Sequence, residues 1–351
     1  MRVLLIYNPT AGDGVDGQRR ALIDRIHAAG HEVRCRSSKD PHMTSALTGS
    51  VDLVVIAGGD GTIAKVARRL RGRDLAIAAL PLGTANNIAT ALGLADAELE
   101  TLIRGWSRGR TIAMDLGVVR GPRGMRSFLE SVGVGLLPQL MTARKVVPGH
   151  APTAEARVAL AVARARKAAQ RLPAIEVRAS LDGRDLSGRY LLLEAMNIGW
   201  VGPRLNLADT DPADGQFDVV FAREDDRDAL VEWLAARERG ADVPRALPAL
   251  RGRRFRIDHG RFGVHVDDKV WAAQPARSEP APLEATLESS IRFRLPASEA
   301  AEESFARDAR WREALEPRGR NPRRFELTSS RWAWPAGGPA RSRRSDRGGS
   351  G

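Results

Sequence analysis

The stretch VDLVVIAGGDGTIAKVARRL, residues 51–70, contains the pattern that decides the fold. Val51–Ala57 is a nearly continuous apolar run, which is typical of a strand buried on both faces of a parallel sheet. Three glycines and an aspartate follow, and the remaining residues have the spacing of a helix to about Leu70. The order strand, glycine loop and helix predicts one unit of an α/β domain.

Two similar units flank this one. The first has the strand Val3–Tyr7, a polar loop and a helix from about Gln18 to Ala29, and the other has the strand Leu75–Leu80 and a helix to Leu92. A weaker strand, Glu32–Cys35, lies between the first two units. Parallel strands end at the same edge of a sheet, where ligands bind in such folds. We therefore expect the three polar loops to lie together at that edge.

After about Ile112 the pattern changes to short alternating segments separated by turn signals such as Asp182-Gly183, which is typical of β structure. The predicted strands are Asp115–Val119, Ser127–Val132, Ile175–Leu181, Tyr190–Asn197, Phe217–Phe221, Phe255–Ile257, Phe262–Val266 and Ile291–Leu295. Only Thr153–Arg171 and Asp226–Glu238 are predicted as clear helices in this part of the chain.

The fold prediction therefore has two parts and a tail. Residues 1–112 are predicted to form an α/β domain, a parallel sheet with helices on both faces, whose three loops make it the candidate for binding a ligand. Residues 113–296 are predicted to form a mainly β, sandwich-like domain, whose last segments can return to the first domain. Residues 297–351 form an Arg-rich tail, which we expect to be largely disordered beyond residue 317.

Composition and charge limit the function classes. Of 351 residues, 43% are hydrophobic and 28% charged, as in folded domains. The single cysteine, Cys35, excludes an internal disulfide and suits a reducing compartment. Met1–Ile6 is too short for a secretory leader, and no apolar run reaches the roughly 18 residues that cross a bilayer. We expect a cytoplasmic protein that can sit peripherally at the inner membrane face.

The net charge of +12 is concentrated at the end of the chain. Residues 317–351 contain nine arginines and only two carboxylates, Glu326 and Asp346. A basic tail can bind nucleic acid, an anionic membrane surface, or nothing in particular. We do not expect a nucleic-acid partner, and a homodimer is left open.

Gly58-Gly59-Asp60-Gly61-Thr62 is the sharpest local feature. Glycines leave room for a phosphate and allow the positive φ angles that point successive N–H groups inward. The N-terminus of the following helix favours an anion. Asp60 is out of place beside an anion unless a cation such as magnesium accompanies it. The alternative is a tight strand–helix turn that Asp60 caps.

Two more loops repeat the arrangement. Pro81-Leu82-Gly83-Thr84-Ala85-Asn86-Asn87 follows the third strand, and Asn8-Pro9-Thr10-Ala11-Gly12 follows the first. Each alone would more often be a capping turn, but three at one sheet edge predict a nucleotide cleft. The segment 12–17 also matches G-x-G-x-x-G, yet its first glycine does not directly end a strand, so we disfavour a Rossmann dehydrogenase.

Acidic residues also gather in the second part of the chain. Asp209, Asp211 and Asp214 precede a glycine turn and are plausible ligands for a hard cation, although an acidic surface turn is equally compatible. The spacing is not that of an EF-hand, because no glutamate follows at the twelfth position. Asp267-Asp268-Lys269, taken alone, is an ordinary charged hairpin tip.

Taken in order, these motifs resemble the diacylglycerol kinase catalytic-domain family, the bacterial soluble lipid kinases that are similar to sphingosine kinases. The likeness covers about residues 1–296 and rests on the three loops, on Asp214-Gly215 and on the strand that ends at Asp267. The ordered set is specific, whereas any single member is not. The family implies an NAD-kinase-like α/β domain, a β sandwich, and an active site between them.

The resemblance also implies site residues. ATP would be bound by Asn8, Pro9, Thr10, Ala11, Gly12, Ser38, Gly58, Gly59, Asp60, Gly61, Thr62, Ile63, Ala64, Gly83, Thr84 and Asn87, with Ser37 as the alternative to Ser38. A structural magnesium would be bound by the Asp214 side chain, with the Asp211 and Gln216 carbonyls nearby. Asp60 and Asp115 would belong to the acidic network around the nucleotide metal.

The chain departs from the family at two places. The family often has Asn-Asp where this chain has Asn86-Asn87, so one carboxylate is missing. Its final motif is commonly Asp-Gly-Glu, with the glutamate as general base, where this chain has Asp267-Asp268-Lys269. A protonated lysine cannot accept the substrate proton. Asp267 or Asp268 could be the base instead, or Lys269 could neutralise the γ-phosphate.

The sequence thus predicts an ATP- and Mg²⁺-dependent lipid kinase that phosphorylates a lipid hydroxyl. Diacylglycerol is the first acceptor by family association alone, and a sphingoid base, another glycerolipid or a polyprenol-like alcohol stays open. The alternatives are a soluble-metabolite kinase of the NAD-kinase type and a nucleotide-binding pseudokinase. Measuring ATP hydrolysis and phosphoryl transfer separates the pseudokinase from both kinases.

Overall fold

The computed structural model describes residues 1–11, 16–122, 124–143, 153–241, 247–259, 262–271 and 281–297. Gly12 and the tail beyond residue 297 lie outside the described residues. All described residues fall within one compact unit, Met1–Leu315, and the predicted boundary between residues 112 and 113 stays a prediction.

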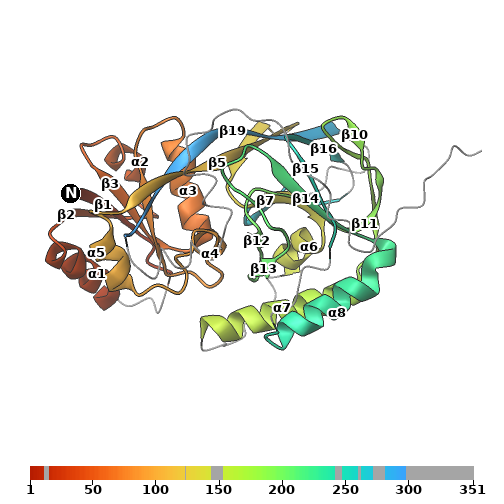
Figure 1. Cartoon of the computed structure of the whole chain (residues 1–351), viewed down its shortest axis with the longest axis horizontal. Coiled ribbons are helices and arrows are strands. Elements are labelled where there is room, and N and C mark those ends of the chain that lie inside the picture. The colour runs from red at the N-terminus through yellow and green to blue at the C-terminus, as the bar shows by residue number, and fades with distance from the viewer. Residues whose placement is uncertain are drawn as a thin grey trace, which may run out of the picture. The chain divides into compact units, whose positions relative to one another are not determined.

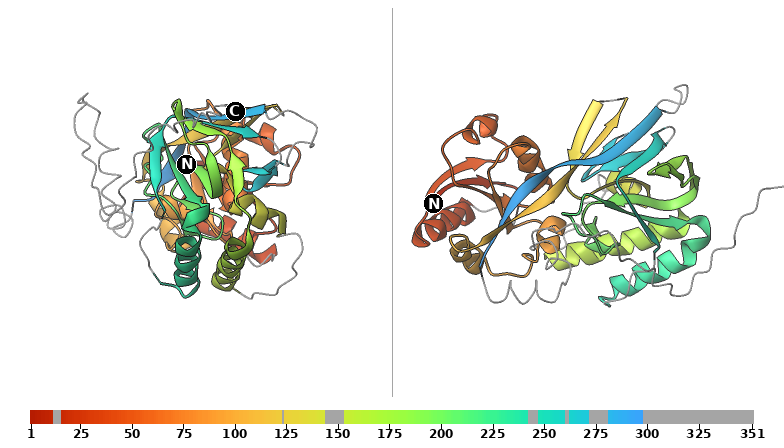
Figure 2. Two further views of the ribbon diagram at one scale, coloured as in Figure 1. Left: turned by 90° about the vertical axis from the view of Figure 1, so that its right-hand side faces the viewer. Right: turned by 45° about the horizontal axis from the view of Figure 1, so that its top comes forward.

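Four parallel strands form the half of the main sheet that carries the glycine loops. β1 (Arg2–Tyr7), β2 (Glu32–Ser37), β3 (Leu53–Gly58) and β4 (Ile77–Pro81) lie in the order β2-β1-β3-β4. The helices here are α1 (Asp16–Ala28), α2 (Met43–Ala46), α3 (Asp60–Leu70), α4 (Asn87–Ala91) and α5 (Leu99–Gly105). α1 and α5 lie on one side of the strands, and α2 and α3 on the other (Figures 1 and 2). The predicted parallel sheet with helices on both faces is confirmed.

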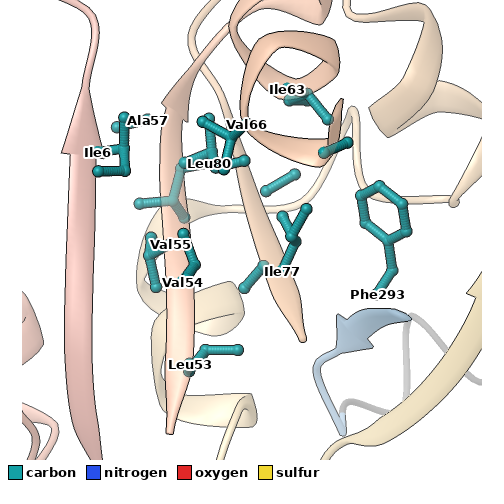
Figure 3. Packing of buried hydrophobic residues seen from close by; sticks show 14 of the residues in the cluster. Ile6, Leu53, Val54, Val55, Ala57, Ile63, Val66, Ile77, Leu80 and Phe293 are labelled. Atoms are coloured by element: carbon teal, nitrogen blue, oxygen red, sulfur yellow. The ribbon is translucent and has the colours of Figure 1, made fainter. Parts of the chain in front are cut away.

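Continuous apolar runs explain why these strands are central. All six residues of β3 are buried, as are five of the six in β1. α3 contributes Ile63 and Val66 to the same core, and Phe293 enters it from the far end of the sequence (Figure 3). A strand buried on both faces needs no polar alternation, so the pattern and the structure agree.

The main sheet continues as an antiparallel sheet through long strands. β19 (Ala281–Leu295) runs parallel to β4, with Phe293 opposite Ile77, and antiparallel to β5 (Arg110–Gly121) along most of its length. Figure 2 shows these two strands passing from one half of the molecule to the other. The remaining strands of the sheet are β6 (Gly124–Phe128), β9 (Ala179–Leu181), β10 (Arg184–Asp185) and β16 (Arg254–His259).

A second sheet packs on the antiparallel half. Its order is β15 (Ala249–Gly252), β14 (Phe217–Arg223), β11 (Gly188–Met196), β7 (Ser131–Gly135), β17 (Val264–Val266) and β18 (Lys269–Trp271), with β8 (Ile175–Val177) on β11. Phe128 and Leu283 of the first sheet share one core with Leu193 and Phe217 of the second. The predicted sandwich-like part is therefore confirmed.

The other face of the second sheet is covered by helices. α6 (Leu136–Ala143), α7 (Ala154–Arg171) and α8 (Arg227–Glu238) share a third hydrophobic cluster with β11 and β14, and the 3₁₀ helix η2 (Glu224–Asp226) precedes α8. The hairpin β12 (Trp200–Val201) and β13 (Leu205–Asn206) forms a small separate sheet. None of the helices in the described ranges is long and apolar enough to span a membrane.

Three sequence predictions were wrong in this region. Ser127–Val132 is not one strand, because the chain leaves β6 after Phe128 and enters the other sheet as β7. Ile175–Leu181 likewise divides into β8 and β9, which belong to different sheets. The apolar helix α6 was missed, since a short apolar run does not by periodicity distinguish helix from strand.

Candidate active site

Two of the three glycine-bearing loops are in backbone contact. A Cβ added to Gly83 would stand 2.5 Å from the Cα of Gly59, and one added to Gly59 would stand 3.0 Å from the Cα of Gly83. The Leu82 amide donates to the Gly58 carbonyl at 3.2 Å. Any side chain at Gly83 would therefore push the loops after β3 and β4 apart, so glycine is required there for close approach.

The first loop joins the same cluster. The Asn8 amide donates to the Ala57 carbonyl at 2.9 Å, and Asn8 Nδ2 donates to Thr62 Oγ1 at 3.1 Å. The Ser38 amide, after β2, donates to the Tyr7 carbonyl at 2.8 Å. The predicted convergence of the loops at one sheet edge is thus confirmed. What they bind stays a prediction for Asn8, Pro9, Thr10, Ala11, Ser38, Gly58, Gly59, Gly61, Thr62, Ile63, Ala64, Gly83, Thr84 and Asn87.

Asp60 joins two loops rather than projecting into open space. Its Oδ1 accepts the Ile88 amide at 2.9 Å, and its carboxylate also accepts the Asn87 amide, so it caps the N-terminus of α4. Burial raises the pKa of Asp60, while these amides and the nearby Arg204 guanidinium oppose the rise. The capping alternative stated from sequence is therefore present, for a different helix from the one expected.

The two asparagines of the third loop have separate contacts. Asn86 adopts φ +52°; its Oδ1 accepts the Gly83 amide at 2.8 Å, and its Nδ2 donates to the carbonyls of Pro81 and Gly83. Asn87 Nδ2 donates to Glu130 Oε2 at 2.9 Å and to the Gly202 carbonyl at 3.2 Å. Asn86 thus fixes the shape of the loop, and Asn87 ties it to the second half of the molecule.

Asp267 is buried and holds the break between β6 and β7. Its carboxylate accepts the amides of Leu129 and Glu130, with Oδ1 at 3.1 and 2.9 Å, and Arg68 Nη1 lies 3.3 Å from Oδ2. Burial raises the pKa of Asp267 to about 6. These amides bond to a carboxylate instead of a neighbouring strand, which explains why the predicted strand Ser127–Val132 is interrupted.

Asp268 is the carboxylate that approaches the glycine loop. A Cβ added to Gly61 would stand 3.0 Å from Asp268 Oδ2, so this side chain lies at the N-terminus of α3. Lys269 Nζ is 3.1 Å from the same oxygen, and both side chains are partly exposed. Of the three residues at the position of the family's final motif, Asp268 has the geometry to reach a ligand held by the loop.

Behind this turn is a buried acidic cluster that the sequence analysis missed. Glu130 is 5% exposed, and burial raises its pKa well above the usual value, with the charges of Asp60 and Asp267 adding to the effect. Glu130 is therefore held in its neutral form more readily than an exposed glutamate. Its position after Phe128-Leu129, in an apolar run, was the signal that could have revealed it.

A second buried pair supports Asp267 from behind. His265 Nε2 is 2.7 Å from Glu194 Oε2, and both side chains are fully buried. They meet across Gly133, where a Cβ would stand 2.1 Å from Glu194 Oε2. His265 Nδ1 is 2.9 Å from the Asp267 carbonyl, so it donates its proton there. Burial alone would lower the pKa of His265, but the contact with Glu194 outweighs it, so that the pKa of His265 is raised. The pKa of Glu194 is raised by burial.

The carboxylates around the predicted metal site already have hydrogen-bond or ion-pair partners. Asp115 Oδ2 accepts the Gly215 amide at 2.7 Å, Asp211 Oδ1 accepts the Ala213 amide, and Asp214 Oδ1 accepts the Gln216 amide. Asp214 Oδ2 is paired with the Arg251 guanidinium. Among the described residues, no group of three or more His, Cys, Asp or Glu side chains is arranged to hold a metal ion. These carboxylates alone do not form a metal site, and the predicted donor set of the Asp214 side chain with the Asp211 and Gln216 carbonyls stays a prediction.

Fold and site together define an α/β domain, joined by shared strands to a β sandwich, with converging glycine loops at the sheet edge. Residues 2–119 match the family model described as the diacylglycerol kinase catalytic domain. The chain is 28% identical over 291 residues to a diacylglycerol kinase of Bacillus subtilis (strain 168), covering 77% of this chain and 87% of that protein. It is also 31% identical over 128 residues to a probable lipid kinase YegS-like of Klebsiella pneumoniae (strain 342), covering 34% and 42% of the two chains.

A solved structure shows the same fold. The structure of a diacylglycerol kinase from Bacillus anthracis str. Sterne superposes with a TM-score of 0.61 at 16% identity, covering 84% of this chain and 96% of that one. The resemblance predicted from the sequence is therefore confirmed: the chain is similar to diacylglycerol kinases and to lipid kinases. This supports a phosphotransferase as the class of enzyme.

Proposed function

We propose that this protein transfers the γ-phosphoryl group of magnesium-bound ATP to a lipid hydroxyl, with diacylglycerol as the first acceptor to test. The observation that carries the proposal is the contact between Gly61 and Asp268: a glycine loop at a helix N-terminus is faced by a carboxylate from the other half of the chain. Such a helix end favours phosphate, and a carboxylate beside it can accept the proton of an attacking hydroxyl.

The loops provide backbone rather than side chains for the nucleotide. Gly59 is the N-cap of α3 and has no side chain to cap the helix, and the partial positive charge of this helix end favours an anion. Magnesium enters with the triphosphate as part of the substrate, and positioning with charge neutralisation supplies most of the acceleration in phosphoryl transfer. The acceptor oxygen forms a bond to the γ-phosphorus while the bond to the leaving ADP oxygen breaks.

We assign the proton acceptor to Asp268 rather than Asp267 or Lys269. The Asp267 carboxylate is buried and is bonded to two backbone amides and Arg68. Lys269 lies beside Asp268 as an ion-pair partner. The acceptor proton moves to Asp268, and release of that proton to solvent is open because the side chain is 37% exposed.

The test is labelled ATP with Mg²⁺ against diacylglycerol, a sphingoid base and a polyprenol in mixed micelles and against NAD in solution, with nucleotide binding measured separately. We expect an organic-soluble labelled product with the wild type, none with Asp60→Ala, and a rate lower by about 10²–10⁴ with Asp268→Asn. Asp225→Asn, at an exposed position in η2, is the matched control. Nucleotide binding without transfer to any lipid would indicate a pseudokinase, and transfer to NAD instead would indicate the soluble-metabolite kinase.

Membrane association belongs to this proposal too. Residues 317–351 carry nine arginines, and juxtaposed basic residues attract anionic lipid headgroups. We expect a chain that ends at residue 316 to bind anionic vesicles more weakly than the full chain at low salt. Equal binding of the two in a vesicle sedimentation assay would remove any role of the tail.

A further inference from the structure

One arginine occupies a backbone conformation that usually requires glycine. Arg204 has φ +54° in the loop Gly202-Pro203-Arg204 between β12 and β13. In three-residue hairpin loops the last position commonly has a positive φ, and glycine is the residue that adopts it without cost. Asparagine and aspartate tolerate this region better than other residues do, but arginine lacks their short polar side chain.

The residues with this conformation are concentrated around the candidate site. Among the described residues other than glycine, positive φ is found at Asn86, Asp182, Arg204 and Asp267. The positive φ of Asp182 is explained by its hairpin turn, and the positive φ angles of Asn86 and Asp267 belong to the loops on the two sides of the site. Strained residues persist mainly where function requires them. The turn accounts for the positive φ of Arg204 as well, but Arg204 is the one among these four whose side chain is not the short polar type that tolerates this conformation.

The hairpin directs Arg204 onto the third glycine loop. Arg204 Nε donates to the Ala85 carbonyl at 2.7 Å, and the Gly202 carbonyl accepts Asn87 Nδ2 at 3.2 Å. The guanidinium is near enough to Asp60 for its charge to oppose the rise in the pKa of that carboxyl. From the other side, Arg157 Nε donates to Thr84 Oγ1 at 3.3 Å. Two guanidinium groups thus lie on adjacent residues of one loop.

We propose that Arg204 binds phosphoryl oxygens of the nucleotide over the loop 82–87, with Arg157 as a second, outer contact. In the described part of the chain the hydrogen bond from the Arg204 side chain to the loop is made through Nε, so the loop contact does not use the paired Nη groups. Such a fork matches two oxygens of a phosphate, and it cannot lose its charge at neutral pH. This inference rests on the proposed function, and it identifies a positively charged side chain of the protein that would contact the nucleotide phosphates.

The alternative is that Arg204 only holds the hairpin on the loop, and three variants separate the two roles. Arg204→Gly removes the side chain and the unfavourable φ together, Arg204→Met removes the charge, and Arg204→Lys keeps it. Arg184→Met, on an exposed arginine of β10, is the matched control. The measurements are the melting temperature, the Kd for a nonhydrolysable ATP analogue with Mg²⁺, and kcat/KM with the lipid acceptor.

We expect Arg204→Gly to melt no lower than the wild type, yet to bind the analogue about 10-fold more weakly and to lose about 100-fold in kcat/KM. Arg204→Met should lose as much activity, Arg204→Lys should regain about 10-fold of it, and Arg184→Met should change none of the three readouts. Wild-type affinity in Arg204→Gly, or a melting temperature that falls in step with activity, overturns the inference.

The outcome for the proposed function is separate. If the wild type binds the analogue but phosphorylates no lipid, the lipid-kinase proposal fails, and the affinity of Arg204→Gly still decides the role of Arg204. If the wild type does not bind the analogue at all, both proposals fall together. Weaker binding in Arg204→Gly with restored binding in Arg204→Lys supports the inference whether or not the wild type phosphorylates a lipid.

Discussion

The two sides of the candidate site are built in opposite ways. The loops after β1, β3 and β4 meet through backbone, with Gly59 and Gly83 in direct contact. The facing turn at Asp267-Asp268 is held by buried ionisable side chains, Glu130, Glu194 and His265 among them. The glycine side therefore depends on the absence of side chains, and the acidic side depends on the pairing of buried ionisable side chains. Substitutions should mainly reduce function on the glycine side and stability on the acidic side.

The glycine side should be the more sensitive in function. Gly83→Ala places a Cβ 2.5 Å from the Cα of Gly59, where only backbone movement can relieve the clash. We expect nucleotide affinity to fall about 100-fold or more, equivalent to about 3 kcal/mol, with overpacking destabilisation of about 1–3 kcal/mol. Calorimetric titration with the ATP analogue and Mg²⁺ measures the first, and urea unfolding the second.

Gly49→Ala is the control for this change. A Cβ at Gly49 meets its nearest neighbour, the Ala46 carbonyl, at an ordinary 3.6 Å. Both readouts should stay near wild type there. If Gly83→Ala binds nucleotide as well as Gly49→Ala does, the backbone contact between the loops is not what builds the site.

The acidic side should be the more sensitive in stability. Glu194→Ala leaves the buried His265 without its partner, and removing one member of a buried pair costs about 3–5 kcal/mol. Chemical unfolding measures the loss, with Glu176→Ala at an exposed position of β8 as the control. A loss below about 1 kcal/mol would mean that the pair contributes little to holding the turn.

Asp267 should give the stability a pH dependence. Its folded pKa of about 6 lies above the usual 3.8, so the folded state holds the proton more strongly. Its contribution is present below about pH 4 and is lost as the pH rises through 6, by about 3 kcal/mol at most. Asp267→Asn cannot ionise. Between pH 4 and pH 7 the wild type should therefore lose stability relative to Asp267→Asn. A difference in unfolding free energy that stays constant over this range would contradict the raised pKa of Asp267.

The smallest effect is expected at the predicted metal donors. Arg251 is paired with Asp214 and lies 3.7 Å from Asp218, and its side chain is 42% exposed. We expect the unfolding free energy of Arg251→Met to be lower than that of the wild type by about 1 kcal/mol at most, because exposed pairs contribute little.

Metal removal is tested on the wild type, in which the arginine is in place. EDTA should change its melting temperature by no more than about 2 °C. A larger fall in the melting temperature would support the structural magnesium that the family resemblance implies.

The comparison also explains what the sequence could predict. The strands and glycine loops of residues 1–95 are local patterns, and Val51–Leu70 alone indicates strand, loop and helix. The converging edge follows from parallel topology. On the other side, Asp267 contacts Leu129 and Arg68 across more than a hundred residues. No local periodicity encodes such contacts, so the turn looked like an ordinary hairpin tip.

Two further errors have the same origin. The broken strands at Leu129 and Arg178 occur where the chain changes sheets, and neither position has a proline or glycine to mark the change. Arg204 could not be recognised from the sequence because the strands β12 and β13 that flank it have only two residues each, too few to show a strand pattern. Buried acids inside apolar runs, such as Glu130 and Glu194, were the usable signal that the sequence analysis passed over.

The central claim is that three backbone loops at one sheet edge grip a single magnesium-bound triphosphate. Amide hydrogen exchange, with and without the nonhydrolysable ATP analogue and Mg²⁺, tests it most directly. We predict joint protection of residues 8–11, 58–64 and 82–88 at one saturating concentration, with little change in α7 and α8. Protection of only one loop, or of segments away from all three, would contradict the account.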